Sequence, residues 1–306
     1  MSTGRKNKSG DQPHPVLRPL TMTQVSRLVR LAENAASARG FPMRYDGAGA
    51  LLSTTDHGMA AGLANLARTV GGLPRQQWRA AVSAHFDQMS PGGEPPEVPE
   101  DLDNELYLRL VDASTIDPDW TERVPELVPG VLIAPATHAG RAVALHFDPD
   151  ALGRPWPELN QIGLANLRRL QDTVEHIQVP GAELTMLGGH MFAASRALVL
   201  DTVLRESLHV ENPSFGCLVA MPVRDILLIH VLHDPTVIYA FAAMVKLATT
   251  FYTESPGPIT PHVYYVADNQ WHQMTDYTNG TADLKSTAAF SNALKRLEAQ
   301  TSTSRP

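Results

Sequence analysis

The segment that most constrains the fold is residues 216–234, which read GCLVAMPVRDILLIHVLHD. Two nearly continuous apolar runs flank the charged pair Arg224 and Asp225. Short runs that are apolar on both faces are typical of strands buried in the middle of a sheet. We therefore predict that residues 217–232 form two adjacent central strands.

Apolar periodicity and turn residues predict what surrounds these strands. Helices are expected over residues 23–39, 62–70, 74–89, 156–174, 195–208, 237–252 and 284–299. Strands are expected near residues 43–45, 50–53, 106–110, 128–135, 141–147 and 183–187, with a hairpin of 262–267 and 271–274 across Asp268 and Asn269. The sequence thus predicts an α+β fold, with a mixed sheet, buried central strands, covering helices and a small mainly helical N-terminal unit.

Composition shifts along the chain indicate its domain organisation. Residues 90–103 (SPGGEPPEVPEDLD) are rich in Pro, Gly and acids, as linkers and surface loops are. We expect a mainly helical unit over 16–89 and an α+β main domain over 104–299. Residues 1–15 and 300–306 are expected to be tails, the first disordered and without the apolar stretch of a secretory signal.

Charge and cysteine content exclude several classes of function. The net charge of -7 argues against nucleic acid, because phosphate backbones are bound by Lys and Arg. Residues 237–251 are shorter than the roughly 20 residues of a membrane span and contain Lys246, so no membrane partner is expected. The one cysteine, Cys217, lies in an apolar run, which indicates neither a disulfide nor a thiolate zinc site and favours the cytoplasm.

The order of short motifs along the chain resembles a known family. The motifs are LYLRL at 106–110, HFD at 146–148, ANLRR at 165–169, GGH at 188–190, ASR at 194–196 and MPVRD at 221–225. Their order over roughly residues 101–275 is similar to that of the YtpQ-like bacterial family of unknown function. The resemblance implies a cytoplasmic α+β protein of bacterial origin, and it carries over no activity and no catalytic residues.

No catalytic set, metal site or cofactor is predicted from the residues themselves. In an extended strand, His230 and His233 point to opposite faces, so they are not expected to share a metal ion. A core histidine with one hydrogen-bond partner is the expected role of His230. Ser195 lacks the Gly-x-Ser-x-Gly setting of a hydrolase nucleophile.

The best candidate for a ligand site is an anion site near the glycine turn. Gly188, Gly189 and His190 precede a predicted helix that carries Arg196, and backbone N–H groups at a helix start can hold an anion. Arg224, at the end of the first central strand, can add charge. The structural alternatives are that Ser195 caps the helix and that Arg224 and Asp225 form a salt-bridged corner.

Two functional hypotheses remain. The leading one is a non-enzymatic cytosolic protein that binds another macromolecule, most simply another protein, in an oligomeric state that the sequence leaves open. The alternative is a hydrolase or transferase that acts on an anionic small molecule near Gly188, Gly189, Arg196 and Arg224. A deep pocket where these arginines, His190 and a carboxylate converge favours the second, and an exposed apolar patch favours the first.

Overall fold

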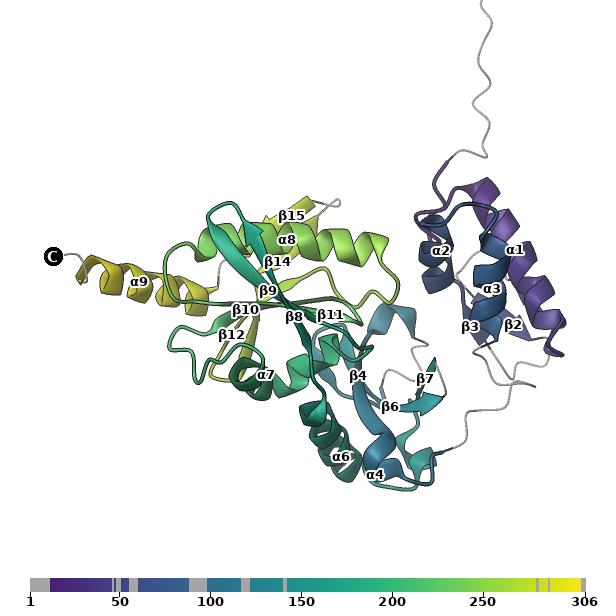
Figure 1. The fold of residues 1–306 in the computed structure, drawn as a ribbon, viewed down its shortest axis with the longest axis horizontal. Coiled ribbons are helices and arrows are strands. Elements are labelled where there is room, and N and C mark those ends of the chain that lie inside the picture. Colours follow the sequence, from purple (N-terminus) through teal and green to yellow (C-terminus); the bar gives the residue numbers. More distant parts are fainter. Residues whose placement is uncertain are drawn as a thin grey trace, which may run out of the picture. The chain divides into compact units, whose positions relative to one another are not determined.

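A computed structural model describes residues 12–45, 47, 51–54, 60–87, 98–116, 122–139, 142–278, 281–285 and 287–303 (Figure 1). The chain divides into two compact units. The first comprises Met1–Glu97, His138–Ala144 and Thr253–Pro256, and the second comprises Val98–Thr137, Leu145–Tyr252 and Gly257–Pro306. Of the predicted linker, residues 90–97 lie outside the described residues, and residues 98–103 lead into a short helix in which Leu102 is buried.

The first unit is mainly helical and contains α1 (Met22–Ser37), α2 (Ala64–Gly71) and α3 (Trp78–Phe86). A three-stranded antiparallel sheet accompanies them, formed by β1 (Met43–Tyr45), β2 (Leu51–Thr54) and β3 (Ala60–Gly62). Thr21 begins α1 with a capping box, in which its hydroxyl accepts from Gln24 N–H while the Gln24 side chain accepts from Thr21 N–H. The unit has its own core, which includes Leu28, Trp78 and Phe86.

This unit starts earlier than the sequence predicts. Pro13 forms a β-bridge with Thr21, and the buried His14 accepts the N–H groups of Val16 and Leu17 on its Nδ1. Residues 12–15 are therefore part of the folded unit rather than of a disordered tail, because their backbone and side-chain bonds close the turn before α1. Residues 1–11 of the predicted tail lie outside the described part of the chain.

Beyond residue 97 helices and strands are mixed. The helices are α4 (Leu102–Glu105), η3 (Ala113–Thr115), η4 (Pro149–Leu152), α6 (Trp156–Arg169), η5 (Ala194–Val199), α7 (Leu200–Glu206), α8 (Val237–Glu254) and α9 (Ala288–Thr303). The strands are β4 (Leu106–Asp112), β5 (Glu126–Val128), β6 (Val131–Ala139), β7 (Ala142–Leu145), β8 (Thr173–Val179), β9 (Ala182–Gly188), β10 (Cys217–Val223), β11 (Ile226–Val231), β12 (Val263–Ala267), β13 (Gln270–Gln273), β14 (Thr275–Thr278) and β15 (Thr281–Leu284). The chain is thus an α+β protein, as predicted. No helix within the described ranges is both long and apolar enough to cross a membrane.

The main sheet of the second unit confirms the two central strands. It has six antiparallel strands in the order β13-β12-β10-β11-β9-β8, so β10 and β11 lie side by side in its middle. Every residue of β10 is buried. Leu218 and Leu228 face a core formed with α8 and α9, whereas Val219 and Ile229 face a core with η5 and α7. Figure 1 shows α8 and α7 on the two sides of this sheet.

The hairpin of β12 and β13 also follows from local sequence. Asp268 and Asn269 connect the strands, and both have positive φ, of 49° and 62°. Two consecutive left-handed residues define the type I′ turn, which matches the twist of a hairpin and which Asp and Asn tolerate better than other non-glycine residues. The structure confirms the predicted hairpin.

Three predicted boundaries differ from the structure. The predicted helix 156–174 ends at Arg169, and the following residues enter the edge strand β8. The predicted helix 284–299 begins only at Ala288, because β15 takes residues up to Leu284. In these two cases strand pairing overrides the local helical pattern. The predicted tail 300–306 begins inside α9, which extends to Thr303.

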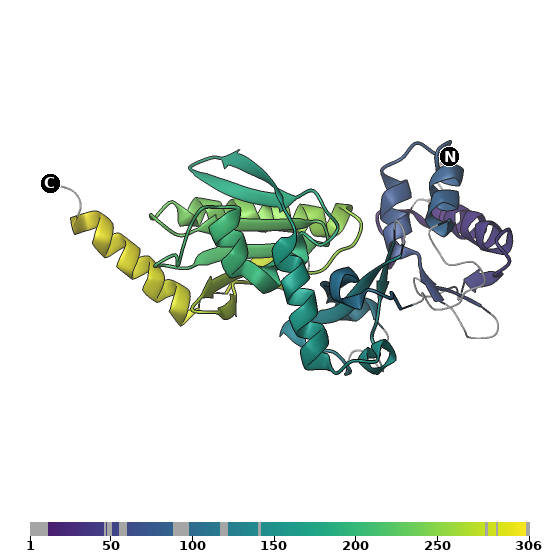
Figure 2. The same cartoon turned by 60° about the horizontal axis from the view of Figure 1, so that its bottom comes forward.

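The position of α6 is set by one glycine and one asparagine (Figure 2, where α6 lies in front). A Cβ atom at Gly163 would lie 2.6 Å from Leu108 Cγ, so only glycine allows α6 to approach β4 this closely. The buried Asn166 side chain donates to the carbonyl oxygens of Asp103 and Leu106, each at 2.8 Å. These contacts fix the C-terminal end of α6, from which the chain enters the candidate site.

Candidate ligand-binding site

Two cavities lie on opposite faces of the β8–β9 hairpin. The larger, of about 1140 Å³, is lined by Val174, His176 and Thr185 among other residues. The smaller, of about 530 Å³, is lined by Glu175 and Met186. Successive side chains of a strand point to opposite faces, and the ladder pairs His176 with Thr185 and Glu175 with Met186. One hairpin therefore serves as a wall for both cavities.

The smaller cavity gathers four of the five residues that the sequence singles out. Its lining consists of Thr173, Glu175, Met186, Gly188, Gly189, His190, Met191, Arg224, Asp225 and Ile226. The glycine turn follows β9, and Arg224 comes from the turn between β10 and β11. The fifth residue, Arg196, lines the larger cavity instead.

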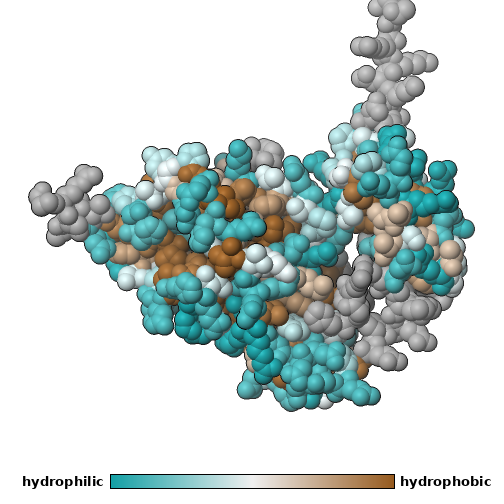
Figure 3. Space-filling model, viewed as in Figure 1, coloured by the Kyte–Doolittle hydropathy of each residue, from teal (hydrophilic) through white to brown (hydrophobic). Residues whose placement is uncertain are grey.

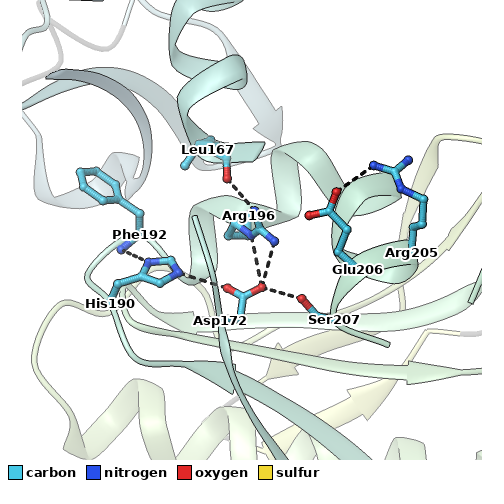
Figure 4. Close-up of polar contacts among 8 residues, drawn as sticks. All are labelled: Leu167, Asp172, His190, Phe192, Arg196, Arg205, Glu206 and Ser207. Atoms are coloured by element: carbon cyan, nitrogen blue, oxygen red, sulfur yellow. Dashed lines mark hydrogen bonds and ion pairs between the residues drawn. The ribbon is translucent and has the colours of Figure 1, made fainter. Parts of the chain in front are cut away.

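A buried carboxylate, Asp172, lines the larger cavity and contacts His190, which lines the smaller one (Figure 4). Its side chain is 0% exposed and lies 3.1 Å from His190 Nε2, 3.0 Å from Arg196 Nη2 and 2.9 Å from Ser207 Oγ. Burial by itself raises the pKa of Asp172. The hydrogen bond from His190, the charge of Arg196 and the Ser207 hydroxyl outweigh burial, so its pKa lies below the ordinary value of 3.8. Asp172 is therefore a charged structural centre.

Arg196 is occupied by this centre. Its Nε and Nη2 donate to Asp172, and its Nη1 donates to the carbonyl oxygen of Leu167 at 2.6 Å. All three nitrogens thus have acceptors, and the charge is balanced by the carboxylate. Contrary to the expectation from the sequence, Arg196 joins α6 to η5 and has no free nitrogen with which to hold a ligand in this structure.

His190 is held in one tautomer by its two partners. Its Nδ1 accepts the N–H of Phe192 at 3.2 Å, so the ring proton belongs on Nε2, which donates to Asp172. Both ring nitrogens are engaged. His190 shapes the turn that borders the smaller cavity, and in this state it offers no lone pair to a reacting group.

The backbone donors after the glycine turn are also occupied. Phe192 N–H donates to His190 Nδ1, Ala193 N–H to the His190 carbonyl, and Ala194 N–H to the Arg224 carbonyl. These three N–H groups are therefore not free to hold an anion, and the anion site near the glycine turn stays a prediction. The expected capping role of Ser195 is wrong, since its hydroxyl accepts from the N–H of Leu110 at 3.0 Å.

The turn at Arg224 leaves two charged side chains unpaired. The backbone of Arg224 is anchored by its N–H to the carbonyl of Gly257 and by its carbonyl to Ala194. Among the described residues, neither Arg224 nor Asp225 has a side-chain hydrogen bond or ion pair, so the proposed salt-bridged corner is not present. The Arg224 side chain, half-buried, lines the smaller cavity.

Arg109, on β4, is a candidate that the sequence analysis did not identify. It is only 7% exposed, and its guanidinium carbon lies 5.5 Å from the ring centroid of Phe192. Within the described parts of the chain its side chain has neither an ion pair nor a hydrogen bond. Burial and then the positive charge of Arg224 lower the pKa of Arg109 to about 10, while Asp225 acts in the opposite direction. The sequence feature that could have identified Arg109 is its position as a charged residue in the otherwise apolar predicted strand LYLRL at 106–110.

His230 and His233 lie close together in the lining of the larger cavity. The prediction that they point to opposite faces of one strand is therefore wrong. Their ring centroids are 5.7 Å apart, because β11 ends at Val231 and the alternation of faces does not continue to His233. The buried His230 donates from Nδ1 to the Glu183 carbonyl at 2.8 Å, as expected of a core histidine. Burial lowers its pKa. Among the residues described, no three His, Cys, Asp or Glu side chains are grouped to hold a metal ion.

Gly189 is expected to be essential to the shape of the turn. Its φ is +93°, and a Cβ there would lie 2.4 Å from Thr173 Oγ1. Gly189→Ala should therefore lower the free energy of unfolding by about 1–2 kcal/mol or more in urea denaturation. Gly188→Ala is the matched control, since Gly188 has no positive φ and its nearest neighbour would be 3.4 Å away. Equal losses in the two variants would contradict this account of the turn.

Comparisons with protein-family models, curated proteins and solved structures gave no match. The resemblance of the motif order to the YtpQ-like family stays a prediction.

Proposed function

We propose that the second unit binds a small molecule through an acidic group, in the smaller cavity, which Arg224 lines and whose residues Arg224 and Asp225 interact electrostatically with Arg109. The observation that carries this proposal is the buried guanidinium of Arg109, which has no hydrogen bond or ion pair among the described residues. A buried charge without a partner costs several kcal/mol of stability. A carboxylate or phosphate oxygen on a ligand would supply the missing acceptor.

The proximity of the two arginines supports an anion rather than a neutral ligand. Arg224 lowers the pKa of Arg109, so the two positive charges interact unfavourably in the free protein. A bound anion near both guanidinium groups would attract each of them, and these two attractions would offset the repulsion between the arginines. Since both arginines lack partners, neither would have to break an existing ion pair to bind it.

The cavity has the size and lining of a small-molecule site. Its volume of about 530 Å³ lies within the range of about 300–1,000 Å³ that such sites occupy. Met186, Met191 and Ile226 contribute apolar surface. A ligand of amino-acid or small-metabolite size would fit this space.

This proposal is narrower than the hypotheses drawn from the sequence. It keeps one part of the enzyme hypothesis, namely an anionic ligand. A hydrolase or transferase reaction stays a prediction, and His190 adds no support to it, since both of its ring nitrogens are hydrogen-bonded. Binding to another protein, a cytoplasmic location and a bacterial origin also stay predictions. Within the described ranges, the exposed large apolar residues include one adjacent pair, Ile238 and Tyr239. Figure 3 shows hydrophobic residues of the second unit reaching the surface between hydrophilic ones.

Thermal unfolding in a panel of anions tests the proposal. Phosphate, sulfate, acetate and citrate, at ionic strength matched with sodium chloride, should include at least one that raises the Tm of the wild-type protein. Arg109→Met should lose this response. Its Tm without ligand should equal or exceed that of wild type, because an apolar side chain replaces an unpaired buried charge.

Arg205→Met is the control variant, because Arg205 is half-exposed and forms an ion pair with its neighbour Glu206 on the surface. It should respond to anions as wild type does. The proposal is wrong if no anion stabilises the wild-type protein, or if Arg109→Met responds as strongly as wild type.

A further inference from the structure

The smaller cavity also carries unpaired negative charge. Glu175 of β8 and Asp225 line it together with Arg224. None of these three side chains has a hydrogen bond or ion pair to any described residue. Charged groups of both signs therefore share one cavity without neutralising each other.

We propose that the ligand is a free amino acid with an apolar side chain, whose carboxylate binds Arg224, with the buried charge of Arg109 nearby, and whose ammonium group binds Glu175 and Asp225. This inference rests on the proposed function and names the class of ligand for the same cavity. The carrying observation is the presence of unpaired carboxylates beside an unpaired guanidinium.

The charge balance of the lining disfavours other anions. Glu175, Asp225 and Arg224 leave the cavity lining with an excess of one negative charge. Arg109 is not part of this lining, but it interacts electrostatically with Arg224 and Asp225 and partly offsets that excess. A polyanion such as a nucleotide would meet two carboxylates and be repelled. A ligand that bears one charge of each sign supplies a partner to Arg224 and to the two carboxylates, and it adds no net charge.

The apolar part of the lining suits an unbranched or flexible side chain. Met186 pairs directly with Glu175 across the β8–β9 ladder, so apolar surface lies next to the carboxylate. Met191 and Ile226 complete this surface. Methionine side chains adapt their shape to their neighbours, which favours an aliphatic group of modest size over a rigid aromatic ring.

Isothermal titration calorimetry with compounds of one carbon skeleton tests the inference. The probes are norleucine (both charges), hexanoate (carboxylate only) and pentylamine (ammonium only). Norleucine should bind at least about tenfold more tightly than hexanoate, the ratio expected for one additional charge-assisted contact of about 1.4 kcal/mol. Pentylamine should bind least. The tripeptide norleucyl-glycyl-norleucine distinguishes a free amino acid from a peptide with free ends.

Substitutions separate the two charges of the site. Glu175→Gln and Asp225→Asn should weaken norleucine binding toward that of hexanoate, while hexanoate binding stays equal or improves. Glu183→Gln is the matched control, because Glu183 lines the larger cavity on the opposite face of the same hairpin, and it should change neither affinity. Arg109→Met should abolish the binding of both acids.

The outcomes distinguish this inference from the proposed function. If hexanoate or another plain anion binds as tightly as norleucine, the inference is overturned and the anion site stands. If the tripeptide binds more tightly than norleucine, a free amino acid is the wrong class. If no anion and no norleucine binds at millimolar concentration, both proposals are wrong.

Discussion

Replacing Asp172 with asparagine is expected to lower the free energy of unfolding by about 3–5 kcal/mol, the cost of removing one partner of a buried ion pair. Asp172 is 0% exposed and holds Arg196, His190 and Ser207 together. The variant leaves the Arg196 guanidinium, which is 1% exposed, without a countercharge. Chemical denaturation of the whole chain in a Trp78→Phe background, followed by tryptophan fluorescence, measures the loss, because Trp78 lies in the first unit whereas Trp156 and Trp271 lie in the second.

A double-mutant cycle separates the ion pair from simple packing. If the unpaired guanidinium causes the loss, Arg196→Met combined with Asp172→Asn should recover part of the stability that Asp172→Asn removes. Glu206→Gln is the control, because it breaks the exposed pair with Arg205 and should cost less than about 1 kcal/mol. A loss in Asp172→Asn no greater than that in Glu206→Gln would refute the structural role of Asp172.

The same cluster determines how stability depends on pH. The pKa of Asp172 is lower in the folded protein than its ordinary value of 3.8, so its stabilising contribution is complete above that value. The contribution declines as pH falls through the folded-state pKa. The stability difference between wild type and Asp172→Asn should therefore be largest near neutral pH and shrink in acid.

Leu228→Asp is expected to have the second large effect. Leu228 is fully buried in β11, between β10 and β9, and it contacts the core beneath α8. A carboxylate there would have no hydrogen-bond donor, because the neighbouring backbone groups are used in the sheet. The free energy of unfolding should fall by about 4 kcal/mol or more, which is an exceptional effect for one substitution.

Two variants control for position and for shape. Leu228→Met conserves the volume and should cost less than about 1.5 kcal/mol. Gln270→Asp introduces the same carboxylate at an exposed position of the edge strand β13, opposite Ala267, and should have little effect. A soluble Leu228→Asp protein with near wild-type stability would show that β11 is not in the centre of the sheet.

Local sequence pattern was sufficient to predict the buried central strands, one hairpin turn and one helix start. The two runs in 216–234 predict β10 and β11 because strands buried on both faces must be apolar throughout. Asp268 and Asn269 predict the hairpin because they tolerate positive φ. The start of α8 follows from Asp234, whose carboxylate accepts the N–H of Thr236 at 2.7 Å.

The candidate site was only half predictable. The glycine turn and Arg224 could be found because glycine and charge are visible in the sequence. Asp172 was missed because residues 170–174 continue the helical spacing of α6, whereas pairing with β9 draws residues 173–179 into the sheet. Arg109 was missed because an arginine within a predicted strand attracts no attention in the sequence. Whether a carboxylate lies close enough to pair with Arg109 is decided by the tertiary structure.

The sequence by itself determined the α+β class, the central strands and the sharp turns, because these depend on hydrophobic periodicity and on the φ preferences of single residues. Only the tertiary structure decided which charges are paired. Asp172 and Arg196 are separated by 24 residues and neutralise each other, whereas the neighbours Arg224 and Asp225 do not. Ion pairing depends on distance and burial in space, and adjacency along the chain determines neither.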